Sequence, residues 1–126
     1  MYIRPTDAEL EILNCLWSQG PLTVRQVHTL LAATKEVGYT TTLKLMQIMH
    51  DKGLLYRTEK GRSHIYVALL GQQETQEHLV SRLLQTAFQG SAASAIEVIL
   101  KTNRFSISEL KQLQSQVEAS LKGSVN

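Results

Sequence analysis

The sequence predicts a mainly α-helical fold with one small antiparallel β-hairpin, and residues 37–70 carry most of this prediction. Leu45, Met46 and Met49 recur at spacings of one, three and four, which places them along one buried stripe of a helix. A hairpin is indicated directly afterwards by two β-favouring runs and the glycine-bearing connection between them, residues 54–58, 63–69 and 59–62. A helix followed by a hairpin with a basic tip is the pattern of a winged helix-turn-helix.

The ends of this helix follow from the residue types that border it. Thr40, Thr41 and Thr42 are residues that cap and open a helix. Gly53 stands at its other end, and glycine adopts the left-handed conformation that closes a helix. We therefore expect a helix over about residues 40–51, with Thr42 facing inward beside the apolar stripe.

Two earlier helices are expected before residue 35. Thr6 and Glu9 have the spacing of a capping box, which places the start of the first helix there and its end near Ser18. Thr23 is expected to cap a second helix that reaches about Ala33. Leu22 is expected to add a strand residue against the hairpin. The side chains expected to face inward from the two helices are Leu10, Leu13, Leu16, Trp17, Val24, Val27 and Leu31.

After residue 70 the pattern is purely helical, so we divide the chain into a DNA-binding domain, 1–70, and a helical region, 71–126. Three short amphipathic helices of about 50 residues bury too little surface to close a core alone. A second copy of the chain is the usual solution, and we expect a homodimer; the alternative is that these helices fold back onto the first domain. The residues expected in the dimer interface are Leu79, Leu83, Phe88, Ile96, Ile99, Leu110, Leu113 and Val117.

Composition sets limits on the class of protein. The chain has 126 residues, of which 43% are hydrophobic and 19% charged, as in an ordered globular protein. No apolar run approaches the roughly 18 residues that a membrane span needs. The N-terminus lacks the apolar core of a secretory signal. We therefore expect a cytoplasmic protein that does not insert into a membrane.

Positive charge is gathered around the helix and hairpin. The net charge is only +2, but residues 25–66 contain seven Lys and Arg against three Asp and Glu. Residues 71–126 contain five of each. This distribution fits a surface that faces phosphates, although an ordinary solvated surface would account for the charge alone.

The outward face of the helix at 40–51 suits the major groove of DNA. Lys44 can donate to guanine, Gln47 can pair with adenine, and Leu43 can pack on a thymine methyl group. The threonines lie at the helix N-terminus, where a phosphate is favoured. The hairpin tip and the second helix add phosphate candidates, although Arg25 is equally well explained as a surface arginine. The candidate DNA-binding residues are Thr40, Thr41, Leu43, Lys44, Gln47, Lys60, Arg62 and Arg25.

An enzyme is not expected, because no nucleophile, phosphate-loop or metalloprotease motif occurs. The four histidines are scattered, and a single cysteine, Cys15, allows neither an internal disulfide nor a cysteine-rich metal cluster. We expect no metal and no cofactor. Two alternatives stay open: a winged-helix module that binds proteins instead of DNA, and, ranked lower, a repressor that senses metal or thiol chemistry through Cys15.

Several motifs resemble the penicillinase-repressor family of bacterial transcription regulators, the BlaI, MecI and CopY group. They stand in order along the chain at residues 5–13, 16–17, 39–41, 51–54, 61–66 and 88–91. This resemblance implies a dimeric winged-helix repressor on a palindromic operator, of the kind that controls β-lactam resistance or copper-handling genes. In resistance systems it also implies a membrane-bound sensor metalloprotease that triggers cleavage of the repressor in its dimerisation region.

The sequence departs from this family pattern at three points. Copper-responsive members carry Cys-x-Cys motifs near the C-terminus, whereas residues 71–126 contain no cysteine. Resistance repressors are cut at an Asn-Phe bond, but here Arg104 separates Asn103 from Phe105. Lys44 and Ile48 stand where many members have Thr and Arg. Direct copper sensing is therefore not expected, and neither the cleaved bond nor the operator sequence follows from the resemblance.

Overall fold

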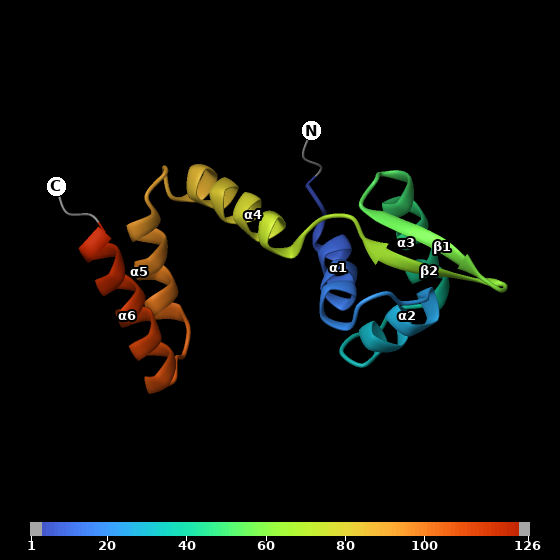
Figure 1. Ribbon diagram of the computed structural model, residues 1–126, viewed down its shortest axis with the longest axis horizontal. Coiled ribbons are helices and arrows are strands. Elements are labelled where there is room, and N and C mark those ends of the chain that lie inside the picture. The colour runs from blue at the N-terminus through green and yellow to red at the C-terminus, as the bar shows by residue number, and fades with distance from the viewer. Residues whose placement is uncertain (1–3, 124–126) are drawn as a thin grey trace. The chain divides into compact units, whose positions relative to one another are not determined.

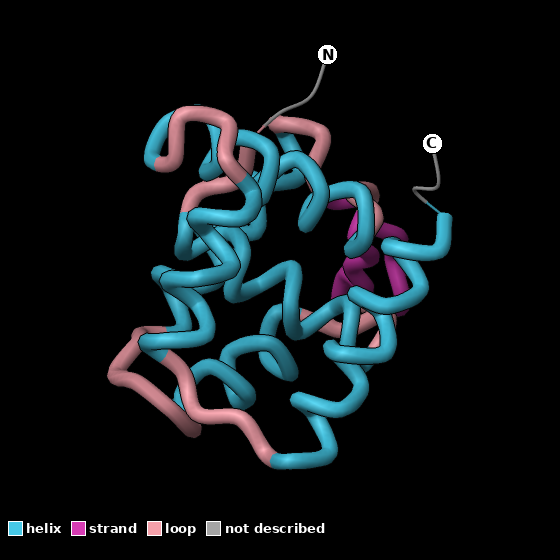
Figure 2. The backbone as a smooth tube through the Cα atoms, turned by 90° about the vertical axis from the view of Figure 1, so that its left-hand side faces the viewer, coloured by secondary structure: helices cyan, strands magenta, loops and turns pink. Residues whose placement is uncertain are grey.

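A computed structural model describes residues 4–123 and confirms the predicted fold class. The described chain is mainly helical, and its strands are confined to one antiparallel hairpin (Figures 1 and 2). The elements in chain order are α1 (Asp7–Gln19), α2 (Val24–Ala32), α3 (Tyr39–Asp51), β1 (Leu55–Lys60), β2 (Ser63–Ala68), α4 (Gln72–Ala87), α5 (Ala92–Thr102) and α6 (Ile107–Gly123).

Capping boxes open the first two helices. The Thr6 hydroxyl accepts a hydrogen bond from the Glu9 amide, and the Glu9 carboxylate accepts one from the Thr6 amide at 2.9 Å. Thr23 caps α2 as predicted, and Gln26 completes a second capping box that was not predicted. Each box satisfies amides that the start of a helix otherwise leaves without a partner. Gly20 ends α1 with a φ of +84°, a conformation that glycine adopts without strain.

The predicted threonine cap of α3 is wrong. The helix begins at Tyr39, and its cap residue is Gly38, which has no side chain to donate or accept a hydrogen bond. Thr42 instead lies one turn inside the helix, where it is buried and its hydroxyl donates to the Gly38 carbonyl at 3.3 Å. The end of the helix is as predicted, since Gly53 has a φ of +84° just after it.

The hairpin turn is shorter than predicted. Glu59 and Lys60 belong to β1, with Lys60 paired to Ser63, so that Gly61 and Arg62 alone make the turn. Gly61 has a φ of +62°, in the left-handed region that tight hairpin turns use. The predicted strand residue Leu22 is confirmed: its backbone forms an antiparallel bridge with Tyr66 of β2, with N–O distances of 3.1 and 2.8 Å.

One apolar core holds the three N-terminal helices and the hairpin together. Trp17 is partly buried against this core, and its indole N–H donates to the Leu70 carbonyl at 2.9 Å, which fastens the chain leaving the hairpin to α1. Leu10 and Leu45, predicted to face inward, lie half-buried at its margin. The buried residues of the core are Ile12, Leu13, Leu16, Leu22, Val24, Val27, Leu31, Met46, Met49, Leu54, Leu55 and Tyr66.

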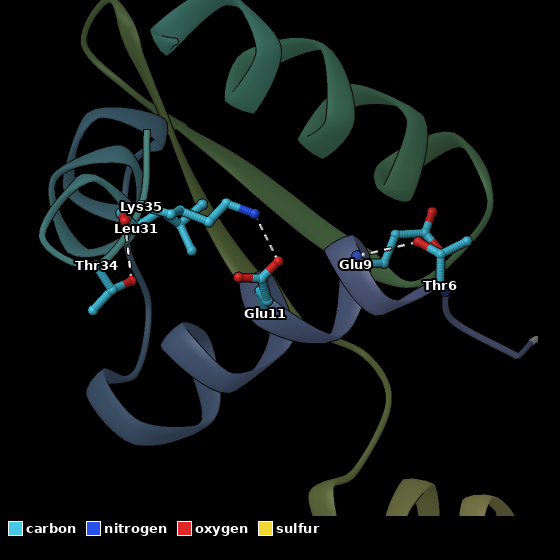
Figure 3. A network of polar contacts seen from close by, with 6 residues as sticks. All are labelled: Thr6, Glu9, Glu11, Leu31, Thr34 and Lys35. Atoms are coloured by element: carbon cyan, nitrogen blue, oxygen red, sulfur yellow. Dashed lines mark hydrogen bonds and ion pairs between the residues drawn. The ribbon is translucent and has the colours of Figure 1, made fainter. Parts of the chain in front are cut away.

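A buried carboxylate links the start of α1 to the end of α3. Glu9 is only 2% exposed, and its second carboxylate oxygen accepts a hydrogen bond from Lys52 Nζ at 2.8 Å. Burial opposes ionisation of Glu9, but the hydrogen bonds from Lys52 and Thr6, with the Lys52 charge, outweigh it and lower the pKa of this carboxyl. A second ion pair, between Glu11 and Lys35 at 2.8 Å, joins α1 to the loop after α2 on the surface (Figure 3).

The chain forms two compact units, one ending at His78 and the other beginning at Leu79, inside α4. Residues 71–78 thus belong with the first unit, where Thr75 is buried and its hydroxyl donates to the Gly71 carbonyl. The domain division at residue 70 stays a prediction. In the second unit, Ser106 and Glu109 cap α6 reciprocally.

We predict that Glu9→Gln lowers the free energy of unfolding by about 1–3 kcal/mol at neutral pH, because Lys52 loses a charged acceptor. The folded-state pKa of Glu9 lies below that of the unfolded chain, so its contribution is present above the unfolded pKa. It is lost as pH falls through the folded value, and the difference between wild type and variant should shrink there. Urea unfolding at several pH values measures this difference.

Glu11→Gln is the matched control for this prediction. Its ion pair with Lys35 has the same length, but both side chains are 43% exposed, so we expect a loss below about 1 kcal/mol. Equal losses for the two variants would show that the burial of Glu9 contributes nothing to its pairing with Lys52.

Candidate nucleic-acid interface

The outward face of α3 carries most of the residues predicted to read DNA. Thr40, Thr41, Lys44 and Gln47 are all exposed, on the side of the helix opposite the buried Thr42, Met46 and Met49. The face therefore offers hydroxyl, ammonium and amide groups, which together can donate to and accept from base edges.

The outward face of α3 differs from the prediction at two apolar residues: Leu43 was predicted to lie on it, and Ile48 was not included. Leu43, expected on the outward face, is half-buried and packs against the core. Ile48 is 42% exposed, and helical spacing places it between Thr41 and Lys44 on the outward face. An aliphatic side chain in that position can pack on a thymine methyl group. Counting every residue of α3 on a helical wheel would have found Ile48.

A cavity of about 360 Å³ lies beside this face, where α2, α3 and the hairpin meet. It brings together residues far apart in the sequence, among them two arginines predicted to bind phosphate, Arg25 and Arg62. Hydroxyl groups of Thr23 and Ser63 also line it, and the half-buried Leu43 forms part of its apolar wall. The lining residues are Thr23, Val24, Arg25, Tyr39, Leu43, Arg62, Ser63, His64 and Tyr66.

The N-termini of α2 and α3 both border this cavity, and neither carries an acidic residue in its first turn. By contrast, α1, α4 and α6 each have one or two there. The N-terminus of a helix carries partial positive charge, which an acidic side chain ordinarily compensates. Two uncompensated helix ends and two arginines around one cavity make a region that attracts an anion such as a DNA phosphate.

The hairpin tip projects further basic groups. Lys60 and Arg62 are exposed, on either side of Gly61. Along the strands, Arg57 donates to the Tyr66 hydroxyl at 3.5 Å, and His64 lies 3.8 Å from the Glu59 carboxylate. Neither Lys60 nor Arg62 is in any of the ion pairs that residues 4–123 form, so both are free to meet phosphates.

The described part of the chain shows no grouping of three or more His, Cys, Asp or Glu side chains suited to a metal ion. Cys15 is half-buried, and burial, with the neighbouring Glu11 charge, raises the pKa of its thiol. A raised pKa favours the protonated thiol, which is less reactive than the thiolate. Between residues 4 and 123, no helix is long and apolar enough to cross a membrane.

Comparison with known proteins decides the family. The family model described as "Penicillinase repressor" matches residues 5–119. The chain belongs to the penicillinase-repressor family. It is 35% identical to a protein named "Transcriptional regulator BlaI" from Mycobacterium tuberculosis over 95 residues, which is 74% of this chain and 69% of the relative. It is 22% identical to a "Penicillinase repressor" from Bacillus licheniformis over 113 residues, 90% of this chain and 88% of the relative.

Membership in the penicillinase-repressor family confirms the resemblance read from the sequence motifs. It identifies the chain as a DNA-binding repressor that regulates transcription, and the name of the family fits regulation of antibiotic resistance. The relatives are regulators, not enzymes.

We predict that Arg62→Ala weakens binding to every DNA duplex by the same factor, because a hairpin-tip arginine meets phosphates and not base edges. The slope of log Kd against log salt should flatten by about one unit for the lost phosphate contact. Fluorescence anisotropy at several salt concentrations measures both. A selective loss for one duplex, with an unchanged slope, would mean that Arg62 reads bases instead.

Proposed function

We propose that the protein is a sequence-specific repressor that binds a palindromic operator as a homodimer. The observation that carries this proposal is the outward face of α3, with Lys44, Gln47 and the threonines exposed beside a cavity lined by Arg25 and Arg62. In DNA-binding proteins some residues read the base edges and others bind the phosphates. The outward face of α3 and the arginines beside it offer both kinds of group.

Base reading is assigned to the outward side chains of α3 in this proposal. Lys44 donates to guanine O6 and N7, and Gln47 pairs with an adenine. Thr40 and Thr41 stand in the first turn of α3, where a phosphate meets hydroxyls and free amides together. Leu43, half-buried by the cavity, contributes less to the DNA surface than Ile48 does.

The apolar faces of the second unit support the proposed homodimer. Ala95 is the one buried residue among the described residues from Leu79 onward. Helices α5 and α6 border a groove of about 810 Å³ with mainly apolar walls. Exposed apolar faces of this kind mark a protein–protein interface, and a second copy of the chain is the most common partner. Of the predicted interface residues, Leu79 and Phe88 are half-buried, and those exposed within the single chain are Leu83, Ile96, Ile99, Leu110, Leu113 and Val117.

The resemblance also suggests how repression ends. We propose that a membrane-bound sensor metalloprotease, acting in response to a β-lactam, leads to cleavage of the repressor in its second unit. The link from α5 to α6 runs through Asn103, which is exposed, and Phe105, which lines the apolar groove. A cut in this link would separate the two helices that border the proposed dimer surface. A repressor of promoters acts where the chromosome lies, which is why we propose a cytoplasmic location.

Operator binding is tested with labelled DNA from upstream of the protein's own gene, compared with a scrambled duplex by fluorescence anisotropy. We expect a preference of at least several hundredfold for the native duplex, with two chains bound per site. Lys44→Ala should remove about 1–3 kcal/mol of that preference if it pairs with a guanine. Weak, equal binding to both duplexes, unaffected by this variant, would favour a protein-binding winged-helix module.

The dimer is tested by placing a charge in the apolar groove. We expect the double variant Leu113→Glu, Val117→Glu to sediment as a monomer in analytical ultracentrifugation, because carboxylates cannot be buried there without a partner. The matched control is Ser108→Glu, Ser115→Glu, which changes the net charge by the same amount on another side of α6. A wild-type protein that sediments as a monomer, or a double variant that remains a dimer, would contradict the assigned interface.

A further inference from the structure

The ring of Tyr39, the first residue of α3, contacts two side chains of α2. The guanidinium carbon of Arg25 lies over this ring, 4.9 Å from its centre. The imidazole of His28 meets the same ring almost at right angles, with 83° between the planes and 5.8 Å between the centres. We call this group the Arg25–Tyr39–His28 stack. It joins α2 to the start of α3 at the edge of the cavity near the hairpin.

Arg25 occupies a position that is electrostatically unfavourable for a cation. It is the second residue of α2, where the helix end carries partial positive charge, and no acidic residue lies in that turn. None of the ion pairs formed within residues 4–123 includes Arg25. The face of Tyr39 attracts the guanidinium, but it does not neutralise its charge. An anion is the partner that this position lacks.

The ring also limits where the guanidinium can go. An arginine held over an aromatic face still has N–H groups available to donate to two oxygens of one anion. A long side chain gives up rotamer freedom when it binds, and contact with the ring limits that freedom before binding. His28 holds the ring from α2, and its buried Nδ1 makes no hydrogen bond within the described residues.

We propose that Tyr39 is a positioning residue that orients the Arg25 guanidinium to bind a phosphate of the DNA backbone at the cavity between α2, α3 and the hairpin. This inference rests on the proposed DNA-binding function and adds to it a role for the aromatic ring at the start of α3. Sequence-independent phosphate binding by Arg25 would then depend on Tyr39, which contributes its ring and not its hydroxyl group.

The test is a double-mutant cycle between Arg25 and Tyr39, read by anisotropy on the native upstream duplex and on the scrambled duplex at several salt concentrations. Arg25→Ala should weaken both duplexes by the same factor and flatten the salt slope by about one unit. Tyr39→Leu should weaken both by about two- to fivefold, the size of an exposed cation–π contact. Tyr39→Phe keeps the ring and should bind like wild type.

The coupling between the two positions decides the proposal. In the Arg25→Ala background, Tyr39→Leu should cause no further loss, because the side chain that the ring orients is gone. Equal losses in both backgrounds would overturn the inference, as would a Tyr39→Phe variant as weak as Tyr39→Leu, which would assign the effect to the hydroxyl. Arg82→Ala, an exposed arginine of α4, is the control for loss of one positive charge.

Two further measurements keep this test separate from folding and from the proposed function. Arg25→Lys changes only an exposed side chain and keeps its positive charge. It should leave the salt slope unchanged and weaken binding by about the same factor as Tyr39→Leu. Binding as tight as that of wild type would contradict the proposal. Lys44→Ala reports on base reading. If it removes the preference for the native duplex while Arg25 and Tyr39 show no coupling, the stack proposal alone fails. If wild type shows no preference, the operator proposal fails.

Discussion

The pairing of Glu9 with Lys52 fixes the start of α1 against the end of α3, on top of the apolar core that holds the first unit together. The buried carboxylate of Glu9 accepts from the Thr6 amide at the start of α1 and from the ammonium group of Lys52, 43 positions further along the chain, at the end of α3. A charge this deeply buried is stable only when its hydrogen bonds are made, so the contact tolerates little displacement of either helix. Because α3 is anchored at its C-terminal end, its outward face is held in a defined orientation.

The charges at the helix N-termini of the first unit are unevenly distributed. Acidic residues compensate the start of α1, which lies at the Glu9 end of the unit, whereas the starts of α2 and α3 are left uncompensated around one cavity. Arg25 and Arg62 reach that cavity from two different elements. The first unit therefore has a buried ion pair at Glu9 and Lys52 and, among the described residues, unpaired positive charge at the cavity. That positive charge can bind an anion such as a DNA phosphate.

The second unit differs from the first in how its helices are stabilised. Its helices α5 and α6 are capped by local hydrogen bonds from Ser91 and Ser106. Their apolar residues, however, are largely exposed within one chain. Such helices gain most of their stability from packing, and this is the reason to assign that surface to a second copy in the proposed dimer.

The sequence by itself determined the features set by neighbouring residues: the fold class, the capping box of α1, the glycine that ends α3, and the hairpin. These depend on contacts three or four residues apart, which a pattern reveals. It misplaced the start of α3 and the side on which Leu43 lies, because packing around the helix decided them. It also left Ile48 out of the outward face, although a helical wheel places it there. Only the tertiary structure brought Arg25 onto Tyr39 and Lys52 onto Glu9, since contacts between distant residues leave no periodic signal in the chain.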